Sequence, residues 1–148
     1  GATNLGVFNG CFYIDPTSKK PTWSNYYSQV NVTASGSISG STNIDAYIYD
    51  DPYYLFEAQS YGTIAKTSIG RNADTVLGTS STVNGLSVTE IEADSGSATN
   101  VGTGAALQFK IIGITKDPEN DDASAANANW HVQFNEHLKF SSTGITGA

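Results

Sequence analysis

Four carboxylates in residues 116–129 come nearest, in type and spacing, to a metal site. They are Asp117, Glu119, Asp121 and Asp122. An EF-hand loop needs glycine at its sixth position and a bidentate glutamate at its twelfth. Counted from Asp117, those positions hold Asp122 and Ala128. We therefore interpret the segment as a solvated acidic loop, and a calcium site of another geometry in residues 116–129 stays open.

The histidines and the adjacent aspartates do not form a catalytic group either. His131 and His137 fall on one face of a predicted strand but about 20 Å apart at the rise of a strand, too far to share a metal. We expect each to be a hydrogen-bonded structural histidine. Asp50 and Asp51 precede Pro52 in a predicted turn, whereas glycosidase carboxylates usually face each other from separate elements. Hydrolase, phosphate-loop and dinucleotide motifs are absent, so we predict no enzymatic activity and no cofactor.

The composition favours an ordered, turn-rich protein. Of its 148 residues, 14% are charged and 11% are aromatic, which argues against intrinsic disorder. With a net charge of −7 and only Lys19 and Lys20 adjacent among the basic residues, we predict no nucleic-acid binding. No apolar run is long enough for a membrane span, and no signal pattern opens the chain. Met is absent, so we do not expect Gly1 to be the encoded first residue.

Alternating apolar residues predict strands separated by turns. The predicted strands are Leu5–Phe8, Cys11–Ile14, Tyr27–Thr33, Ile44–Tyr49, Tyr54–Gln59, Leu107–Thr115 and Trp130–Leu138. Turn signals include Asn9-Gly10 and Asp50-Asp51-Pro52. Residues 71–104 have no clear pattern, and we expect loops with short strands there. We predict an all-β single domain over residues 1–148, a β-sandwich or a barrel, for which a jelly roll is one arrangement.

The two C-terminal strands should supply much of the core. Trp130, Val132 and Phe134 alternate with polar residues, which indicates one buried face. Phe109 and Ile111 lie in a run that is apolar on both faces, as in a central strand. Away from these strands, Cys11 is the single cysteine. It is predicted to be a buried small hydrophobe that cannot form an internal disulfide.

Aromatic residues gather near two turns. Residues 47–57 are rich in tyrosine around Pro52, and residues 15–27 combine two prolines with Trp23 and two tyrosines but show little strand pattern. We predict that residues 1–27 are partly an extended arm, whose aromatic side chains anchor a protein partner. The alternative that Trp23 caps the core of its own domain is equally favoured. The predicted interface residues are Trp23, Tyr26, Tyr27, Tyr53 and Tyr54.

Several short segments, in the same order along the chain, resemble one family of viral proteins. They are Leu5-Gly6-Val7-Phe8-Asn9-Gly10-Cys11, Tyr49-Asp50-Asp51-Pro52, Phe56-Glu57-Ala58-Gln59, Asn84-Gly85-Leu86-Ser87, Phe109-Lys110-Ile111-Ile112-Gly113, Asp117-Pro118-Glu119-Asn120 and Asn135-Glu136-His137. The family is that of small β-rich structural proteins in virions of tailed, podovirus-like bacteriophages. The resemblance implies a decoration or cement protein that binds the major capsid protein on the outer surface of the capsid. It supplies no catalytic residues.

The exposed aromatic region around residues 47–56 also suggests association with copies of the same chain. A trimer is favoured because of the docking positions that capsid shells offer, and a dimer is the competitor. The rival function is a tail-fibre tip or another carbohydrate- or receptor-binding module of the virion, since exposed tyrosine and tryptophan on a β-sandwich can stack on sugars.

Overall fold

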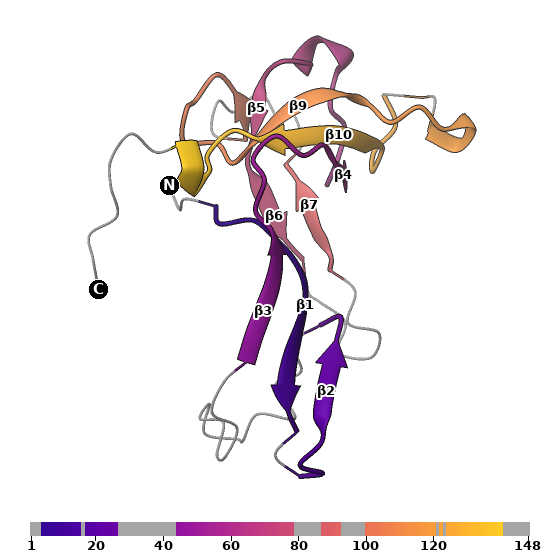
Figure 1. Cartoon of the computed structure of the whole chain (residues 1–148). Coiled ribbons are helices and arrows are strands. Elements are labelled where there is room, and N and C mark those ends of the chain that lie inside the picture. Colours follow the sequence, from indigo (N-terminus) through magenta and orange to yellow (C-terminus); the bar gives the residue numbers. More distant parts are fainter. Residues whose placement is uncertain are drawn as a thin grey trace. The chain divides into compact units, whose positions relative to one another are not determined.

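The computed structural model describes most of the chain, which is built from short strands and three-residue 3-10 helices (Figure 1). The described residues are 4–15, 17–26, 44–78, 87–92, 100–120, 122 and 124–140. This content confirms the all-β prediction, and the described strands form no closed barrel. None of the helices in these ranges is long and apolar enough to cross a membrane.

The chain divides into two compact units. Unit 1 comprises Gly1–Leu5, Asp51–Gly78 and Thr89–Ala148, and unit 2 comprises Gly6–Asp50 and Thr79–Val88. The composition of the sequence gives no sign of these boundaries, because no linker-like stretch separates the units.

Unit 1 contains a five-stranded antiparallel sheet in the order β4-β10-β9-β5-β8, of which β4, β5, β9 and β10 are labelled in Figure 1. Its strands are β4 (Phe56–Gln59), β5 (Asn72–Ala73), β8 (Val101–Gly102), β9 (Phe109–Ile114) and β10 (Asn129–Phe134). The sequence predicts that β9 is a central strand, and the strand order of the sheet confirms this. β10 ends before the predicted Leu138, because the backbone N–H groups of Asn135 and Glu136 both donate to the carbonyl of Gln108 and turn the chain.

The core of unit 1 lies on one face of this sheet. Trp130, Val132 and Phe134 on β10 and Ile111 on β9 are buried, as predicted, and Phe109 is half-buried. Other apolar side chains complete the core, among them Ile64, Ala73, Ile91 and Val101. The opposite face of β9 differs from the prediction of two apolar, buried faces, since Ile112 is 41% exposed.

A small second sheet covers part of this core. It pairs β6 (Thr75–Leu77) with β7 (Thr89–Ile91), and Ile91 is fully buried. The described part of the weakly patterned residues 71–104 thus contains four short strands, in agreement with the expected mixture of strands and loops. Their signal in the sequence is faint because strands of two or three residues are too short for alternation to show.

Unit 2 contains a three-stranded antiparallel sheet in the order β2-β1-β3. β1 is Val7–Ile14, β2 is Pro21–Ser24, and β3 is Ile44–Tyr49, with the bounds predicted for it. The turn predicted at Asn9-Gly10 is wrong, because β1 runs through it with a shift of register between Phe8 and Gly10. Gly10 has φ +123°, and a Cβ atom there would lie 2.8 Å from the carbonyl oxygen of Ser24. Glycine at position 10 therefore permits the β-bulge and lets the backbone of β2 approach β1 closely.

Residues 1–27 were predicted to be partly an extended arm, and within them Pro21–Ser24 forms a strand of this sheet. Pro21–Ser24 pairs with β1, with Trp23 opposite Phe12 and Pro21 opposite Ile14. Proline is tolerated at the first position of a strand, where its missing N–H is not needed. The pairing depends on β1 rather than on any pattern within β2 itself. The strand predicted at Tyr27–Thr33 lies outside the described residues.

Candidate interaction surface

One face of the unit 2 sheet carries a row of aromatic rings, which we call the aromatic face: Phe12, Trp23 and Tyr47. The ring centroids of Phe12 and Trp23 are 4.7 Å apart, and those of Trp23 and Tyr47 are 5.3 Å apart. Trp23 and Tyr47 belong to the outer strands β2 and β3, so their rings meet across β1. Gly10, opposite Tyr47, has no side chain to separate them. The bulge glycine therefore helps to bring the rings into one row.

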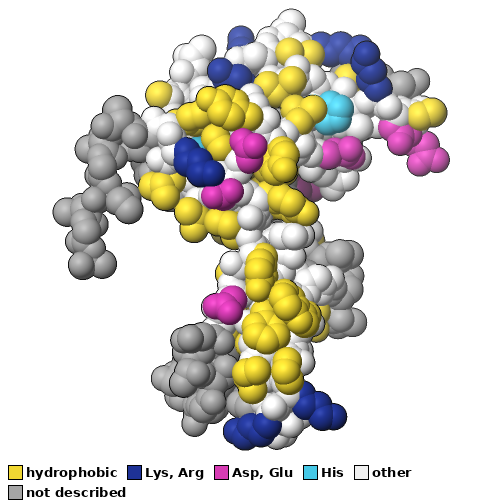
Figure 2. Space-filling model, in the orientation of Figure 1, with side chains coloured by type: hydrophobic (Ala, Val, Ile, Leu, Met, Phe, Trp, Pro, Cys, Tyr) yellow, Lys and Arg dark blue, Asp and Glu magenta, His cyan; other side chains and the backbone are white. Residues whose placement is uncertain are grey.

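The aromatic face is exposed although it is apolar. Trp23 is 68% exposed, and Tyr47, Tyr49 and Ile14 are exposed as well. In Figure 2, hydrophobic side chains gather over the part of the surface that belongs to this sheet. Exposed apolar groups in a contiguous patch mark a surface for contact with another molecule.

The other face of the same sheet is buried at Cys11 and Tyr13. This confirms the prediction of a buried thiol, and burial raises the pKa of Cys11 above its ordinary value. The Cys11 Sγ contacts the carbonyl oxygen of Tyr26 at 3.7 Å. Because successive side chains of β1 point to opposite faces, burial of Cys11 and Tyr13 directs Phe12 and Ile14 outward.

A second aromatic surface lies in unit 1, at the turn predicted around Pro52. The Tyr53 N–H donates to Asp51 Oδ1 at 2.9 Å, and the Tyr54 N–H donates to the Asp51 carbonyl at 3.2 Å. Tyr53 is 73% exposed, and its ring contacts Phe140 edge-on at 5.5 Å. The side chain of Gln133 donates to the Tyr53 carbonyl at 2.9 Å and ties the turn to β10.

The predicted interface residues are divided between the two units. Trp23 is in unit 2, whereas Tyr53 and Tyr54 are in unit 1, and all three are exposed. The exposure of Trp23 excludes the alternative that it caps a core. Tyr26 is half-buried, and its carbonyl accepts a hydrogen bond from Ser24 Oγ at 2.6 Å. Tyr27 lies outside the described residues.

The turn that joins β1 to β2, here called the hairpin tip (residues 15 and 17–20), is organised by one carboxylate. Asp15 Oδ1 accepts the backbone N–H groups of Thr17 at 2.8 Å and Ser18 at 2.6 Å. The Asp15 N–H donates to the Lys20 carbonyl at 2.9 Å, and the Lys19 N–H donates to the Asp15 carbonyl at 2.9 Å.

The stabilisation that Asp15 gives to the hairpin tip depends on pH. The Ser18 and Thr17 N–H groups lower the pKa of Asp15 below its ordinary value, because they stabilise the charged carboxylate. The resulting stabilisation of the hairpin tip is present above the ordinary pKa of aspartate. It is lost as the pH falls through the lowered pKa. The tip therefore keeps its hydrogen bonds at neutral pH.

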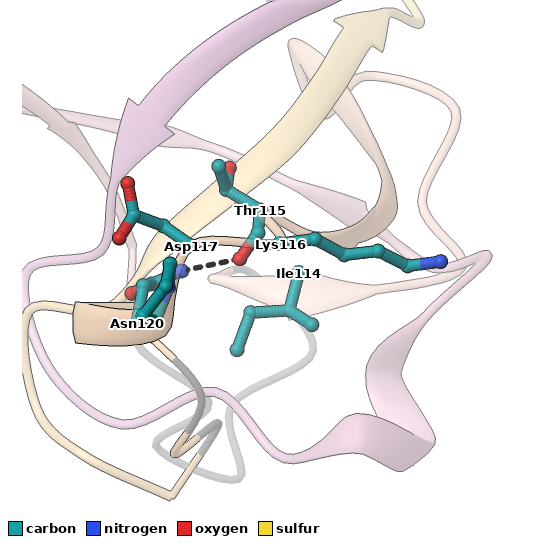
Figure 3. Close-up of a pocket in the computed structure, with 6 residues that line it drawn as sticks. Ile114, Thr115, Lys116, Asp117 and Asn120 are labelled. Carbon is teal, nitrogen blue, oxygen red and sulfur yellow. Dashed lines mark hydrogen bonds between the residues drawn. The ribbon is translucent and has the colours of Figure 1, made fainter.

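A shallow hollow of about 390 Å³ follows β9 in unit 1 (Figure 3). It is lined by Ile114, Thr115, Lys116, Asp117, Pro118 and Asn120. The Asn120 side chain spans the two ends of the β9–β10 connection. Its Nδ2 donates to the carbonyls of Thr115 at 2.9 Å and Asn129 at 2.8 Å, and its Oδ1 accepts the Asn129 N–H at 2.8 Å. These polar groups of Asn120 are engaged in holding the loop, which favours a structural role for the hollow.

Two carboxylates of residues 116–129, those of Asp117 and Asp122, accept hydrogen bonds within local turns. Asp117 Oδ1 accepts the Glu119 N–H at 3.0 Å, and Asp122 Oδ1 accepts the N–H and the hydroxyl of Ser124 at 2.8 and 2.6 Å. The Ser124 hydroxyl and N–H lower the pKa of Asp122 below its ordinary value. Within the described ranges, no three His, Cys, Asp or Glu side chains gather as a metal site. Asp121 lies outside those ranges.

We expect EDTA to leave the melting temperature of the protein unchanged, because Asp117 and Asp122 accept backbone N–H groups of their own turns and no metal-ligating cluster forms among the described residues. Differential scanning fluorimetry with EDTA, with calcium and with neither provides the measurement. A fall of several degrees in EDTA that added calcium reverses would instead establish a metal site in residues 116–129.

His137 in unit 1 is a structural histidine, as predicted. The residue is 2% exposed, with Nε2 3.0 Å from the Leu5 carbonyl oxygen and Nδ1 accepting the Lys139 N–H at 3.1 Å. Because Nδ1 accepts a hydrogen bond from the Lys139 N–H, Nε2 carries the proton and donates to the Leu5 carbonyl oxygen. The ring also contacts those of Phe134 and Phe140 at centroid distances of 5.0 and 6.2 Å. Both nitrogens are therefore used in holding the chain together.

No protein-family model, curated protein or solved structure matches this chain. The class that its architecture defines is that of an all-β protein with an exposed aromatic sheet face.

Proposed function

We propose that this chain is a non-enzymatic structural protein of a tailed-phage virion, which decorates and stabilises the capsid by binding the major capsid protein on its outer surface. The exposed aromatic face of unit 2 is the observation that supports this proposal most. Tryptophan and tyrosine are the residues most enriched at the energetic centres of protein interfaces. The phage assignment itself rests on the sequence segments that resemble decoration proteins.

The geometry of the aromatic face suits binding to protein. Trp23 contacts the rings of both Phe12 and Tyr47, so its own ring is held in place and little side-chain entropy is lost on binding. Many copies on one shell multiply a modest contact into a stable coat. We propose that copies also associate with one another, as a trimer at local threefold positions, with a dimer as the competing arrangement.

Removing Trp23 and Tyr47 together should prevent decoration. The double variant Trp23→Ala/Tyr47→Ala should bind undecorated shells at least about 30-fold more weakly than wild type, as expected for loss of interface hot spots. Co-sedimentation of purified protein with shells gives the affinity. Tyr61→Ala is the matched control, because Tyr61 is 61% exposed but belongs to unit 1. Full occupancy by the double variant would contradict the assignment of the aromatic face as the capsid contact.

A receptor- or carbohydrate-binding module of the tail is the second candidate, because a row of exposed rings can also stack on sugars. The copy number in purified virions separates the two functions. Decoration requires on the order of hundreds of copies per particle, whereas a tail component is present in a handful. Wild-type protein that never binds shells and instead purifies with tails would overturn the decoration proposal.

A further inference from the structure

We propose that the aromatic face binds an arginine side chain of its partner protein, whose guanidinium group stacks on the exposed rings and pairs with the carboxylate of Asp45. This inference rests on the proposed function in so far as the partner is a protein. It adds the chemistry of the partner residue, and it assigns Asp45 a role in binding.

Asp45 shares the aromatic face with the three rings. It is opposite Phe12 in the register of β3 and β1, and Phe12 is in turn opposite Trp23 on β2. Directly opposed residues of an antiparallel sheet point to the same face, with Cβ atoms about 4.5–5.5 Å apart. Tyr47 follows Asp45 by two residues on β3, so it points to that face as well. The sheet therefore places one carboxylate beside the row of rings.

The carboxylate of Asp45 is available to a partner. Asp45 is exposed, and no hydrogen bond or ion pair engages it in the part of the chain that the structure describes. It is also the one Asp, Glu, Lys or Arg residue within β1, β2 and β3. Lys19 and Lys20 lie outside the face, in the hairpin tip beyond the last strand pair. In Figure 2, an acidic side chain borders the hydrophobic side chains of this sheet.

The charges favour a cation as the group that covers this face. A partner that covers Asp45 removes water from its carboxylate, which is unfavourable unless the partner supplies a positive charge. The faces of the aromatic rings attract the same positive charge, and tryptophan attracts it most strongly. A chain of net charge −7 is also drawn towards basic surfaces at longer range. Rings, carboxylate and net charge therefore all favour a basic side chain.

Arginine fits this arrangement better than lysine does. Its guanidinium group is planar, so it can lie flat on an aromatic ring and still donate two parallel hydrogen bonds to a carboxylate. Trp23 presents its ring for such stacking, because it is 68% exposed. Phe12 lies between Trp23 and Asp45 in the register of the sheet, which suits a group that contacts a ring and the carboxylate together.

Two substitutions at Asp45 measure the contribution of its charge to binding. Asp45→Asn keeps the shape of the side chain and should bind undecorated shells about three- to tenfold more weakly at low salt. Asp45→Lys should bind about 30-fold more weakly or worse, because two positive charges then meet. Both losses should shrink near ~1 M salt, where screening acts within about 3 Å. Because Asp45 is exposed, both variants should keep the melting temperature of wild type.

Asp45→Lys also separates binding from protection of the sheet edge. β3 is an outer strand of the described sheet, and charged side chains on outer strands discourage unwanted strand pairing. Lysine serves that purpose as well as aspartate does, so only a role in binding predicts a loss for this variant. Glu57→Lys is the matched control, because Glu57 is an exposed carboxylate on β4, an outer strand of the unit 1 sheet. It changes the net charge equally and should bind as wild type does.

A short peptide tests the ligand chemistry without capsids. The chain has two tryptophans, of which Trp23 is exposed and Trp130 is fully buried. In an NMR titration with acetyl-Gly-Arg-Gly-amide, the indole N–H signal of Trp23 should shift saturably, and that of Trp130 should stay in place. The same peptide with citrulline is uncharged and should cause no saturable shift. Asp45→Asn should weaken the response to the arginine peptide by about threefold or more.

The two experiments distinguish failure of this inference from failure of the decoration function. A saturable response to the arginine peptide and weaker shell binding by both Asp45 variants would support both proposals. The same response from a protein that never binds shells would support this inference and overturn decoration. Shell binding by Asp45→Lys at wild-type affinity would leave decoration standing and overturn this inference. So would an absent response to the arginine peptide, an equal response to the citrulline peptide, or saturable binding of the neutral sugar maltohexaose at Trp23 instead.

Discussion

Replacing Phe134 by alanine should lower the free energy of unfolding of unit 1 by about 3–5 kcal/mol, the usual loss for a buried phenylalanine. Phe134 is 4% exposed at the end of β10. Its ring stacks on Phe109 at 5.0 Å and contacts Phe56 edge-on at 5.3 Å. Truncation would leave a cavity among three rings, since His137 contacts the same side chain. Urea unfolding followed by tyrosine and tryptophan fluorescence measures the loss.

Ile112→Ala is the matched control for that experiment. Ile112 lies on the neighbouring strand β9 but is 41% exposed, so its truncation should cost less than about 1 kcal/mol. A Phe134→Ala variant that loses less than about 1 kcal/mol would mean that β10 turns the opposite face to the core.

The second large effect is expected at His137. Replacing it by alanine should cost about 3 kcal/mol or more, because ring contacts are lost and the Leu5 carbonyl and the Lys139 N–H lose their partner. His137→Phe keeps an aromatic ring but forms neither hydrogen bond, so it should cost less, about 1–3 kcal/mol. Urea unfolding of both variants gives the two values.

Amide hydrogen exchange at Leu138 tests the mechanism behind this effect. The Leu138 N–H donates to the Asn4 carbonyl at 2.9 Å. If the imidazole holds residues 4–5 against Leu138–Phe140, exchange at Leu138 should accelerate in both variants. Unchanged exchange, together with wild-type stability of His137→Phe, would show that only ring packing matters at this position. His131→Ala, on a half-buried histidine of β10, is the control.

The parts of the fold that the sequence predicted are those with a strong local pattern. β3 and the buried face of β10 follow strict alternation over six residues each, so period two alone located them. β2 was missed because its four residues include Pro21 and two hydroxyl side chains, and the strand exists only through its pairing with β1. Asn9-Gly10 was misassigned because a bulge glycine and a turn glycine look alike in sequence.

Part of the candidate surface was predictable as well, because some of its residues lie in a clear local sequence pattern. Tyr53 and Tyr54 were expected to be exposed, and they are. For Trp23, exposure and capping of its own core were equally favoured, and it is exposed. Phe12 was not included, because it lies in an apolar run that suggested burial. The alternation of Cys11 and Tyr13 with Phe12 and Ile14 carried the missing signal, since only one of the two sets can face a core. Which set does so depends on what covers the sheet, and that information is not local.

The pairing of Asn4 with His137 places a constraint on the order in which unit 1 can fold. Asn4 and His137 form a parallel bridge, and the Asn4 side chain donates to the Glu136 carbonyl at 3.0 Å, across a separation of 132 residues. During synthesis, the partners of residues 4 and 5 at residues 136–138 do not exist until the ribosome has passed Leu138. Closing so long a loop late carries an entropy cost that nearby pairings such as β6 with β7 avoid. The N-terminal stretch should therefore be the last part of unit 1 to become protected from exchange during refolding, although it is the first to be made.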